Sequence, residues 1–111
     1  MEAYSYDRRK VVANQIGQTI LDQMGGARRL KVMVGLQQYG WLPKGVYIKW
    51  AAGKRSKGNY LEVTLRSDDT YDMTFYNVTI KAKKPVKSYS GVYADQLVAL
   101  FEKQTGLYLR F

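Results

Sequence analysis

The chain has 111 residues and a mass of 12.8 kDa, and its 18 Lys and Arg against 9 Asp and Glu give a formal net charge of +9 and a pI near 9.8. Neither Cys nor His occurs, which excludes disulfides, Cys or His metal sites and any Cys or Ser-His nucleophile. A chain of this length predicts one domain, residues 1–111, with a single core. No apolar run has the length of a signal peptide or a membrane span, so we expect no membrane partner and a cytoplasmic location.

The first predicted element is an amphipathic helix over residues 7–24. Asp7 is a suitable N-cap, and Gly25 and Gly26 supply the stop because glycine reaches the left-handed conformation without a Cβ clash. The apolar stripe of this helix recurs at four-residue spacing at Val12, Ile16, Ile20 and Met24.

The next segment, residues 28–34, fits two patterns. Its apolar residues alternate as in a strand, yet Leu30, Met33 and Val34 also suit one helical turn, and the sequence leaves the choice open. An irregular stretch follows around Trp41, whose ring we expect to seal the edge of the core.

Three strands are predicted where apolar and polar residues alternate, over residues 46–51, 60–66 and 71–76. The polar links 53–59 and 67–70 have the composition of hairpin loops, which favours an antiparallel meander. The apolar register of the third strand changes near Tyr76, as at a bulge. Pro85, farther along, permits only an edge strand or a connector.

The last predicted elements are a helix capped by Ser90 and ended by Gly106, and a short final strand over residues 107–111. Together the elements predict an α+β domain in which an antiparallel meander of three to five strands packs against an N-terminal and a C-terminal helix. We expect the helices to cover one face of the sheet and to leave the other to water or a partner.

The positive charge is concentrated in the middle of the chain. Residues 31–60 hold six basic residues and no acidic one, and therefore carry +6 of the +9. Long cationic side chains at a hairpin reach phosphates readily, which makes nucleic acid the leading partner. The phosphate contacts predicted around this hairpin are Lys49, Lys54, Arg55, Lys57 and Arg66. A simpler interpretation is that the loop is merely solvated.

Further residues extend the predicted nucleic-acid site. Tyr47 and Tyr60, with Tyr76, share the non-core face and are placed to stack bases, although strands favour tyrosine in any case. A second basic run either adds phosphate contacts or protects an edge strand from pairing, and it contains Lys81, Lys83 and Lys84. Arg28 and Arg29 offer another phosphate contact, but a charged helix end is the better explanation.

No motif points to catalysis. Asp68, Asp69 and Asp72 form the acidic cluster of the chain, and a turn explains them better than a bound cation does. No phosphate-binding loop occurs, and no carboxylate pair accompanies a nucleophile. We therefore expect a non-enzymatic protein without a cofactor or a metal.

Several short motifs follow one another along most of the chain: Asn14-Gln15-Ile16 with Gly25-Gly26, Asn59-Tyr60, Asp69-Thr70-Tyr71-Asp72-Met73-Thr74-Phe75, Gly91-Val92-Tyr93-Ala94-Asp95 and Thr105-Gly106-Leu107-Tyr108. In these motifs the sequence resembles a widespread family of small, mostly uncharacterised phage and prophage proteins. Its irregular stretch over residues 36–43 is longer than is usual in that family. The resemblance implies a phage setting inside a bacterial cell, where small non-enzymatic proteins often bind nucleic acid or block host machinery.

The leading hypothesis is a small basic phage-type protein that binds DNA or RNA through a basic hairpin and a tyrosine-bearing sheet face. The alternative is an inhibitor of a host defence or replication complex, which would dock on the acidic surface of a nucleic-acid-handling protein. A self-associating accessory protein is a third hypothesis. The sequence does not distinguish DNA from RNA as the ligand. It also leaves open the sequence preference, the host target and the oligomeric state.

Overall fold

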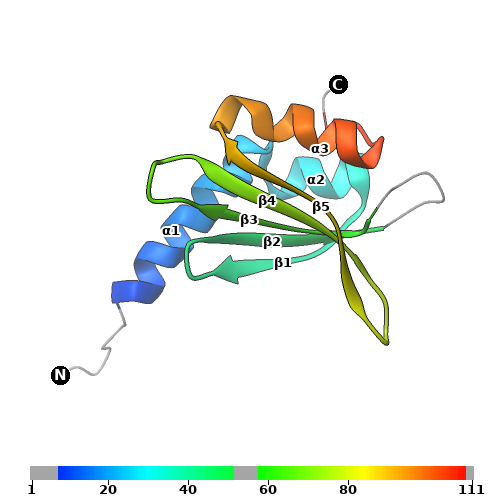
Figure 1. The fold of residues 1–111 in the computed structure, drawn as a ribbon, viewed down its shortest axis with the longest axis horizontal. Coiled ribbons are helices and arrows are strands. Elements are labelled where there is room, and N and C mark those ends of the chain that lie inside the picture. Colours follow the sequence, from blue (N-terminus) through cyan, green and yellow to red (C-terminus); the bar gives the residue numbers. More distant parts are fainter. Residues whose placement is uncertain (1–7, 52–57, 110–111) are drawn as a thin grey trace.

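The computed structural model of the protein describes residues 8–51 and 58–109, with side chains from residue 14 onward. Its helical elements are α1 (Arg8–Gln23), α2 (Gly26–Val34), the 3-10 helix η1 (Ala94–Gln96) and α3 (Leu97–Thr105). Its strands are β1 (Leu36–Leu42), β2 (Gly45–Trp50), β3 (Tyr60–Leu65), β4 (Tyr71–Val78) and β5 (Lys83–Val92). The strands pair antiparallel in chain order, so β1 and β5 form the two edges of the sheet (Figure 1). The predicted α+β meander between N-terminal and C-terminal helices is confirmed.

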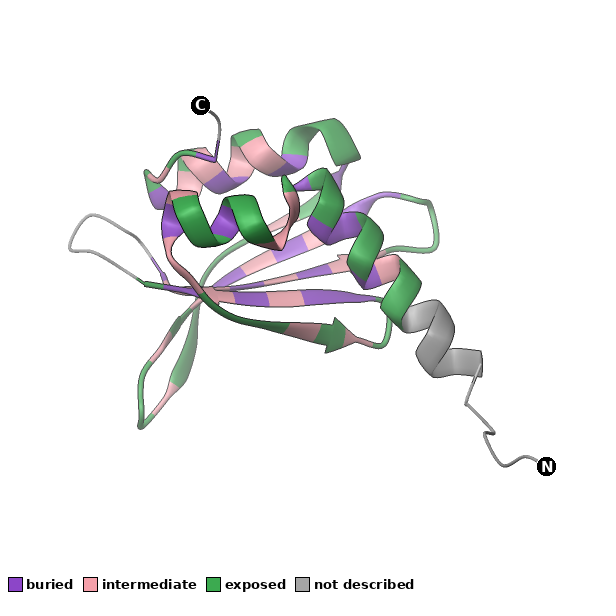
Figure 2. Cartoon of the chain, turned by 180° about the vertical axis from the view of Figure 1, so that it is seen from behind, coloured by how far each residue is buried: buried purple, intermediate pink, exposed green. Residues whose placement is uncertain are grey.

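One face of the sheet packs against the helices and the other carries none of them (Figure 2). Alternate strand residues such as Ile48, Val63 and Met73 are buried on the helix side. The Trp50 ring meets the Phe101 ring of α3 edge to face at 5.1 Å between centroids. Burying such aromatic rings supplies much of the hydrophobic stabilisation of a small domain.

The ambiguous segment after Gly25 is helical and forms α2. Leu30 and Val34, four residues apart, are buried, whereas Val32, which a strand would place beside them, is 69% exposed. Gly25 and Gly35 bracket the helix in the left-handed conformation, with φ of 111° and 72°. The helical spacing is favoured because it brings the apolar residues of this short segment to one side.

The stretch around Trp41, interpreted from sequence as irregular, is the edge strand β1. Trp41 lies opposite Val46 of β2 and therefore points to the helix side. A Cβ at Gly17 of α1 would come within 2.4 Å of the Trp41 ring, so glycine at this position lets the helix approach the strand. Trp41 remains 37% exposed and lies at the rim of the core.

Two expectations for the C-terminal region are wrong. Ser90 does not cap a helix but belongs to β5, and the helical chain begins after Tyr93, whose backbone N–H donates to Gln96 Oε1 at 2.9 Å. Residues 107–109 form no strand, and side chains of α3 accept from the N–H groups of Leu107 and Leu109. The Leu109 N–H donates to Glu102 Oε2 at 2.8 Å while the Leu109 side chain is buried.

Two local predictions for the sheet agree with the structure. The pairing of β4 with β5 shifts register between Phe75 and Tyr76, where a bulge was predicted. Pro85 lies in the edge strand β5, where its missing N–H leaves no carbonyl inside the sheet without a hydrogen-bond donor. Within residues 8–51 and 58–109, no helix is long and apolar enough to cross a membrane.

Candidate nucleic-acid interface

The open face of the sheet, opposite the helices, is built from the strand residues that alternate with the core residues. Directly paired residues of antiparallel strands point to the same side and therefore form rows across the sheet. One row contains Gln38, Lys49, Tyr60 and Tyr76, and the next contains Gly40, Tyr47, Glu62, Thr74 and Ser88. The structure thus brings the predicted Tyr47, Lys49 and Tyr60 together on one face.

Three tyrosines from three neighbouring strands form a continuous cluster on this face. The Tyr47 and Tyr60 rings stack with 5.5 Å between centroids and 12° between planes. Tyr76 meets Tyr60 edge to face at 5.8 Å. The Tyr47 ring lies over Gly40, where any Cβ would come within 2.6 Å of it. All three side chains are half-buried, so the cluster forms a firm apolar floor on the sheet.

Lys83 from the edge strand β5 closes this cluster. Its Nζ lies 4.7 Å from the Tyr60 ring centroid and 4.4 Å from that of Tyr76, and it forms an ion pair with Glu62 Oε2 at 2.7 Å. Both tyrosine hydroxyls also donate to Glu62, each at 3.4 Å. The Lys83 ammonium is therefore partly neutralised inside the fold and is less suited to bind a phosphate than its exposure suggests.

The same surroundings perturb the Tyr60 hydroxyl. Burial, reinforced by the negative charge of Glu62, raises the pKa of Tyr60 to about 12 from its usual 10.0. The fold therefore favours the neutral phenol. The stability that this preference contributes is complete below about pH 10 and is lost as the pH rises through about 12.

The end of β4, the start of β5 and the turn between them project beyond the rest of the sheet as a two-stranded arm, residues 77–84 (Figure 1). Asn59 holds the base of this arm. Its side-chain amide donates to the Val78 carbonyl at 2.9 Å and its Oδ1 accepts from the Val78 N–H at 2.7 Å. The side chain acts as a peptide group and continues the β3–β4 pairing by one more step.

Three lysines near this end of the sheet have no carboxylate partner in the described part of the chain, and one of them, Lys84, points away from Tyr76 because it pairs with Asn77. Lys49 adjoins Tyr60, Lys81 lies at the tip of the arm, and Lys84 lies opposite Asn77. We call Lys49, Tyr60, Lys81, Lys83 and Lys84 the basic end. The predicted Lys54, Arg55 and Lys57 lie outside the described residues. Ala51 and Gly58, the described residues on the two sides of this gap, lie beside the basic end.

At the opposite end of the open face the arginine is balanced by carboxylate partners. Arg66 Nη1 lies 3.0 Å from Asp72 Oδ1, and its Nε lies 3.5 Å from Asp68 Oδ1. Ser90 donates to Asp72 at 2.7 Å, and this bond, followed by Arg66, lowers the pKa of Asp72 below its usual 3.8. We call Arg66, Asp68, Asp72 and Ser90 the balanced end. Arg66, predicted as a phosphate contact, is thus committed to carboxylates.

The acidic turn before β4 has a structural explanation. Asp68 Oδ1 accepts from the Thr70 hydroxyl at 2.6 Å and from the Thr70 N–H at 3.1 Å, and these bonds lower the pKa of Asp68. Asp69 adopts a positive φ of 65°, which Asp tolerates in turns. Among the described residues, no group of three or more acidic side chains is arranged to hold a metal ion.

Arg28 and Arg29 do not join the basic end. Both are exposed on α2, in the helix layer on the other side of the sheet. Two residues that organise the site were not predicted from the sequence, namely Glu62 and Asn59. Glu62 could have been singled out from the sequence, because it is the one acidic residue between residues 23 and 67, a stretch that is otherwise basic.

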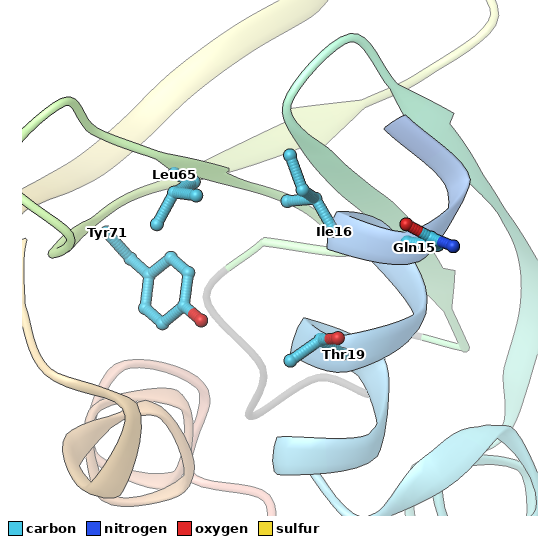
Figure 3. Close-up of a pocket in the computed structure, with 5 residues that line it drawn as sticks. All are labelled: Gln15, Ile16, Thr19, Leu65 and Tyr71. Carbon is cyan, nitrogen blue, oxygen red and sulfur yellow. The ribbon is translucent and has the colours of Figure 1, made fainter. Parts of the chain in front are cut away.

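A small pocket of about 190 Å³ lies between α1 and the strands β3 and β4 (Figure 3). Its lining comprises Gln15, Ile16, Thr19, Leu65 and Tyr71. Leu65 and Tyr71 lie at the balanced end of their strands, on the helix side, and the Tyr71 hydroxyl donates to Gln23 Oε1 at 2.9 Å. The pocket is therefore separate from the open face.

No protein-family model, curated protein or solved structure matches this chain. The resemblance to small phage proteins, and the bacterial setting that it implies, stay predictions.

Proposed function

We propose that this protein binds nucleic acid, without catalysis, through the basic end of the open face. The observation that carries the proposal is that Lys49, Lys81 and Lys84 lie at the end of the sheet that bears the tyrosine cluster and have no carboxylate partners among the described residues. The one acidic residue beside them, Glu62, is already paired with Lys83. The proposed site therefore combines an apolar floor with a rim of lysines at one end of the sheet.

Each part of this surface suits one part of a nucleic acid. Lysine side chains at the rim neutralise backbone phosphates, which releases condensed counterions and drives association. Tyr47, Tyr60 and Tyr76 offer aromatic surface on which sugars or bases pack. Since the three rings pack against one another, they act as a floor rather than as separate intercalators.

The test is a titration of labelled duplex and single-stranded oligonucleotides with the protein at several salt concentrations. Contacts from three lysines predict a slope of about −2.7 for the logarithm of the binding constant against that of salt with duplex DNA. Affinity should then fall about 40-fold between about 50 and about 200 mM salt. Failure to bind any oligonucleotide at the lowest salt would overturn the proposal and favour the alternative of a host protein as the partner.

A further inference from the structure

The tip of the arm presents an apolar side chain that the fold does not use. Ile80 is 106% exposed, more than any other large apolar residue of the described chain, with Tyr108 next at 71%. It occupies a tight turn in which the Thr79 N–H donates to the Ala82 carbonyl at 2.8 Å. Turns favour Gly, Asn, Asp or Pro at such positions, and an isoleucine there contributes nothing to the turn itself.

The arm that carries Ile80 is held in place at its base. Asn59 makes two hydrogen bonds to Val78, and Lys83 is fixed between Glu62 and two tyrosine rings. The Thr79 hydroxyl also accepts from the Ala82 N–H at 3.2 Å, which stiffens the turn. A side chain on such a support is preorganised, so little ordering entropy is lost when it inserts into a partner.

The charge around Ile80 has a single sign. Residues 73–94 contain four lysines and no Asp or Glu. Lys81 is exposed beside Ile80 in the turn, and the exposed Lys84 lies farther along in β5, opposite Asn77. An apolar point with cations close by suits a surface in which an apolar layer lies beside lines of negative charge. The base stack between the two phosphate backbones of duplex DNA is such a surface.

We propose that the arm is a wedge for duplex DNA, in which Ile80 enters the minor groove and opens a base step while Lys81 and Lys84 bind the flanking phosphates. This inference rests on the proposed function and names its ligand class. Apolar side chains that open base steps in this way work from the minor groove and kink the duplex toward the major groove. The wedge therefore explains the exposed Ile80, the rigid base of the arm and the absence of acidic residues by one activity.

The test compares Ile80→Ala with Val32→Ala, which shortens another exposed β-branched residue, on α2 in the helix layer. Bending of a short duplex is measured by energy transfer between dyes on its two ends, and affinity is measured on the same duplex. We expect the unaltered protein and Val32→Ala to bend the duplex. Ile80→Ala should abolish the bend and weaken binding roughly tenfold, with an unchanged salt slope because no phosphate contact is lost.

The outcomes separate the wedge from nucleic-acid binding in general. If Ile80→Ala binds and bends the duplex as the unaltered protein does, or if the unaltered protein prefers a single strand to the duplex, the wedge is overturned while the proposed function stands. If no oligonucleotide binds at low salt, both proposals fail. Thermal unfolding of both variants should match that of the unaltered protein, since both side chains are exposed.

Discussion

The two ends of the open face both carry cations, but they use them differently. At the balanced end, Arg66 is matched by Asp68 and Asp72. At the basic end one carboxylate, Glu62, serves Lys83, and the neighbouring lysines have no such partner in the described chain. β3 separates the ends by roughly 17 Å at the usual rise of a strand. If the proposed function holds, the count of basic residues matters less for binding than the local balance with carboxylates.

The largest expected effect comes from removing unpaired cations at the basic end. The double variant Lys49→Ala, Lys84→Ala should weaken oligonucleotide binding about tenfold or more at low salt. It should also reduce the salt slope by about 2, since two phosphate contacts are lost. Fluorescence anisotropy with a labelled oligonucleotide measures both quantities.

Two controls sharpen this comparison. Lys31→Ala with Lys103→Ala removes the same charge from the helix layer, and it should alter binding much less. Arg66→Ala removes a cation that is already paired and should leave the affinity within about twofold. If Arg66→Ala weakens binding as much as the double variant does, the distinction between the two ends is wrong.

An intermediate effect, in the opposite direction, is expected at Glu62. Glu62→Gln removes the negative charge of the basic end and releases Lys83, so affinity should rise a few-fold and the salt slope should steepen by about 1. The same substitution should lower the pKa of Tyr60 from about 12 toward its usual value, which an ultraviolet titration of the tyrosines detects. Asp95→Asn, which neutralises an exposed acid in η1, is the matched control. Unchanged affinity and an unchanged Tyr60 titration would together contradict this account.

The smallest effect is expected at the balanced end and concerns acid stability. The folded state lowers the pKa of Asp72, so Asp72 stabilises the fold above the usual Asp pKa of 3.8, and this contribution is lost as the pH falls through the lowered value. Asp72→Asn should therefore reduce the loss of stability below about pH 4, as urea unfolding at a series of pH values would show. Asp69→Asn keeps a residue that tolerates the positive φ and serves as control. Equal acid sensitivity of Asp72→Asn and the unaltered protein would contradict the prediction.

Much of the fold could be predicted because burial leaves a periodic pattern. β2, β3 and β4 lie close to their predicted ranges, since each buries one apolar face and exposes the other. β1 was not predicted because an edge strand beside the rim of the core has little burial on either face, and Tyr39 and Trp41 remain 44% and 37% exposed. The helical state of α2 was undecided because both periods fit so short a segment.

The sequence by itself determined the sign and size of the charge, the absence of Cys and His, and the apolar faces that make an α+β meander. Only the tertiary structure decided which cations are paired with carboxylates, because ion pairing joins residues far apart in the chain. Lys83 meets Glu62 across 21 positions, and Asn59 meets Val78 across 19. No local pattern specifies such contacts, since they depend on strand register. The net charge of +9 thus offers a candidate site only where the register leaves lysines without carboxylates.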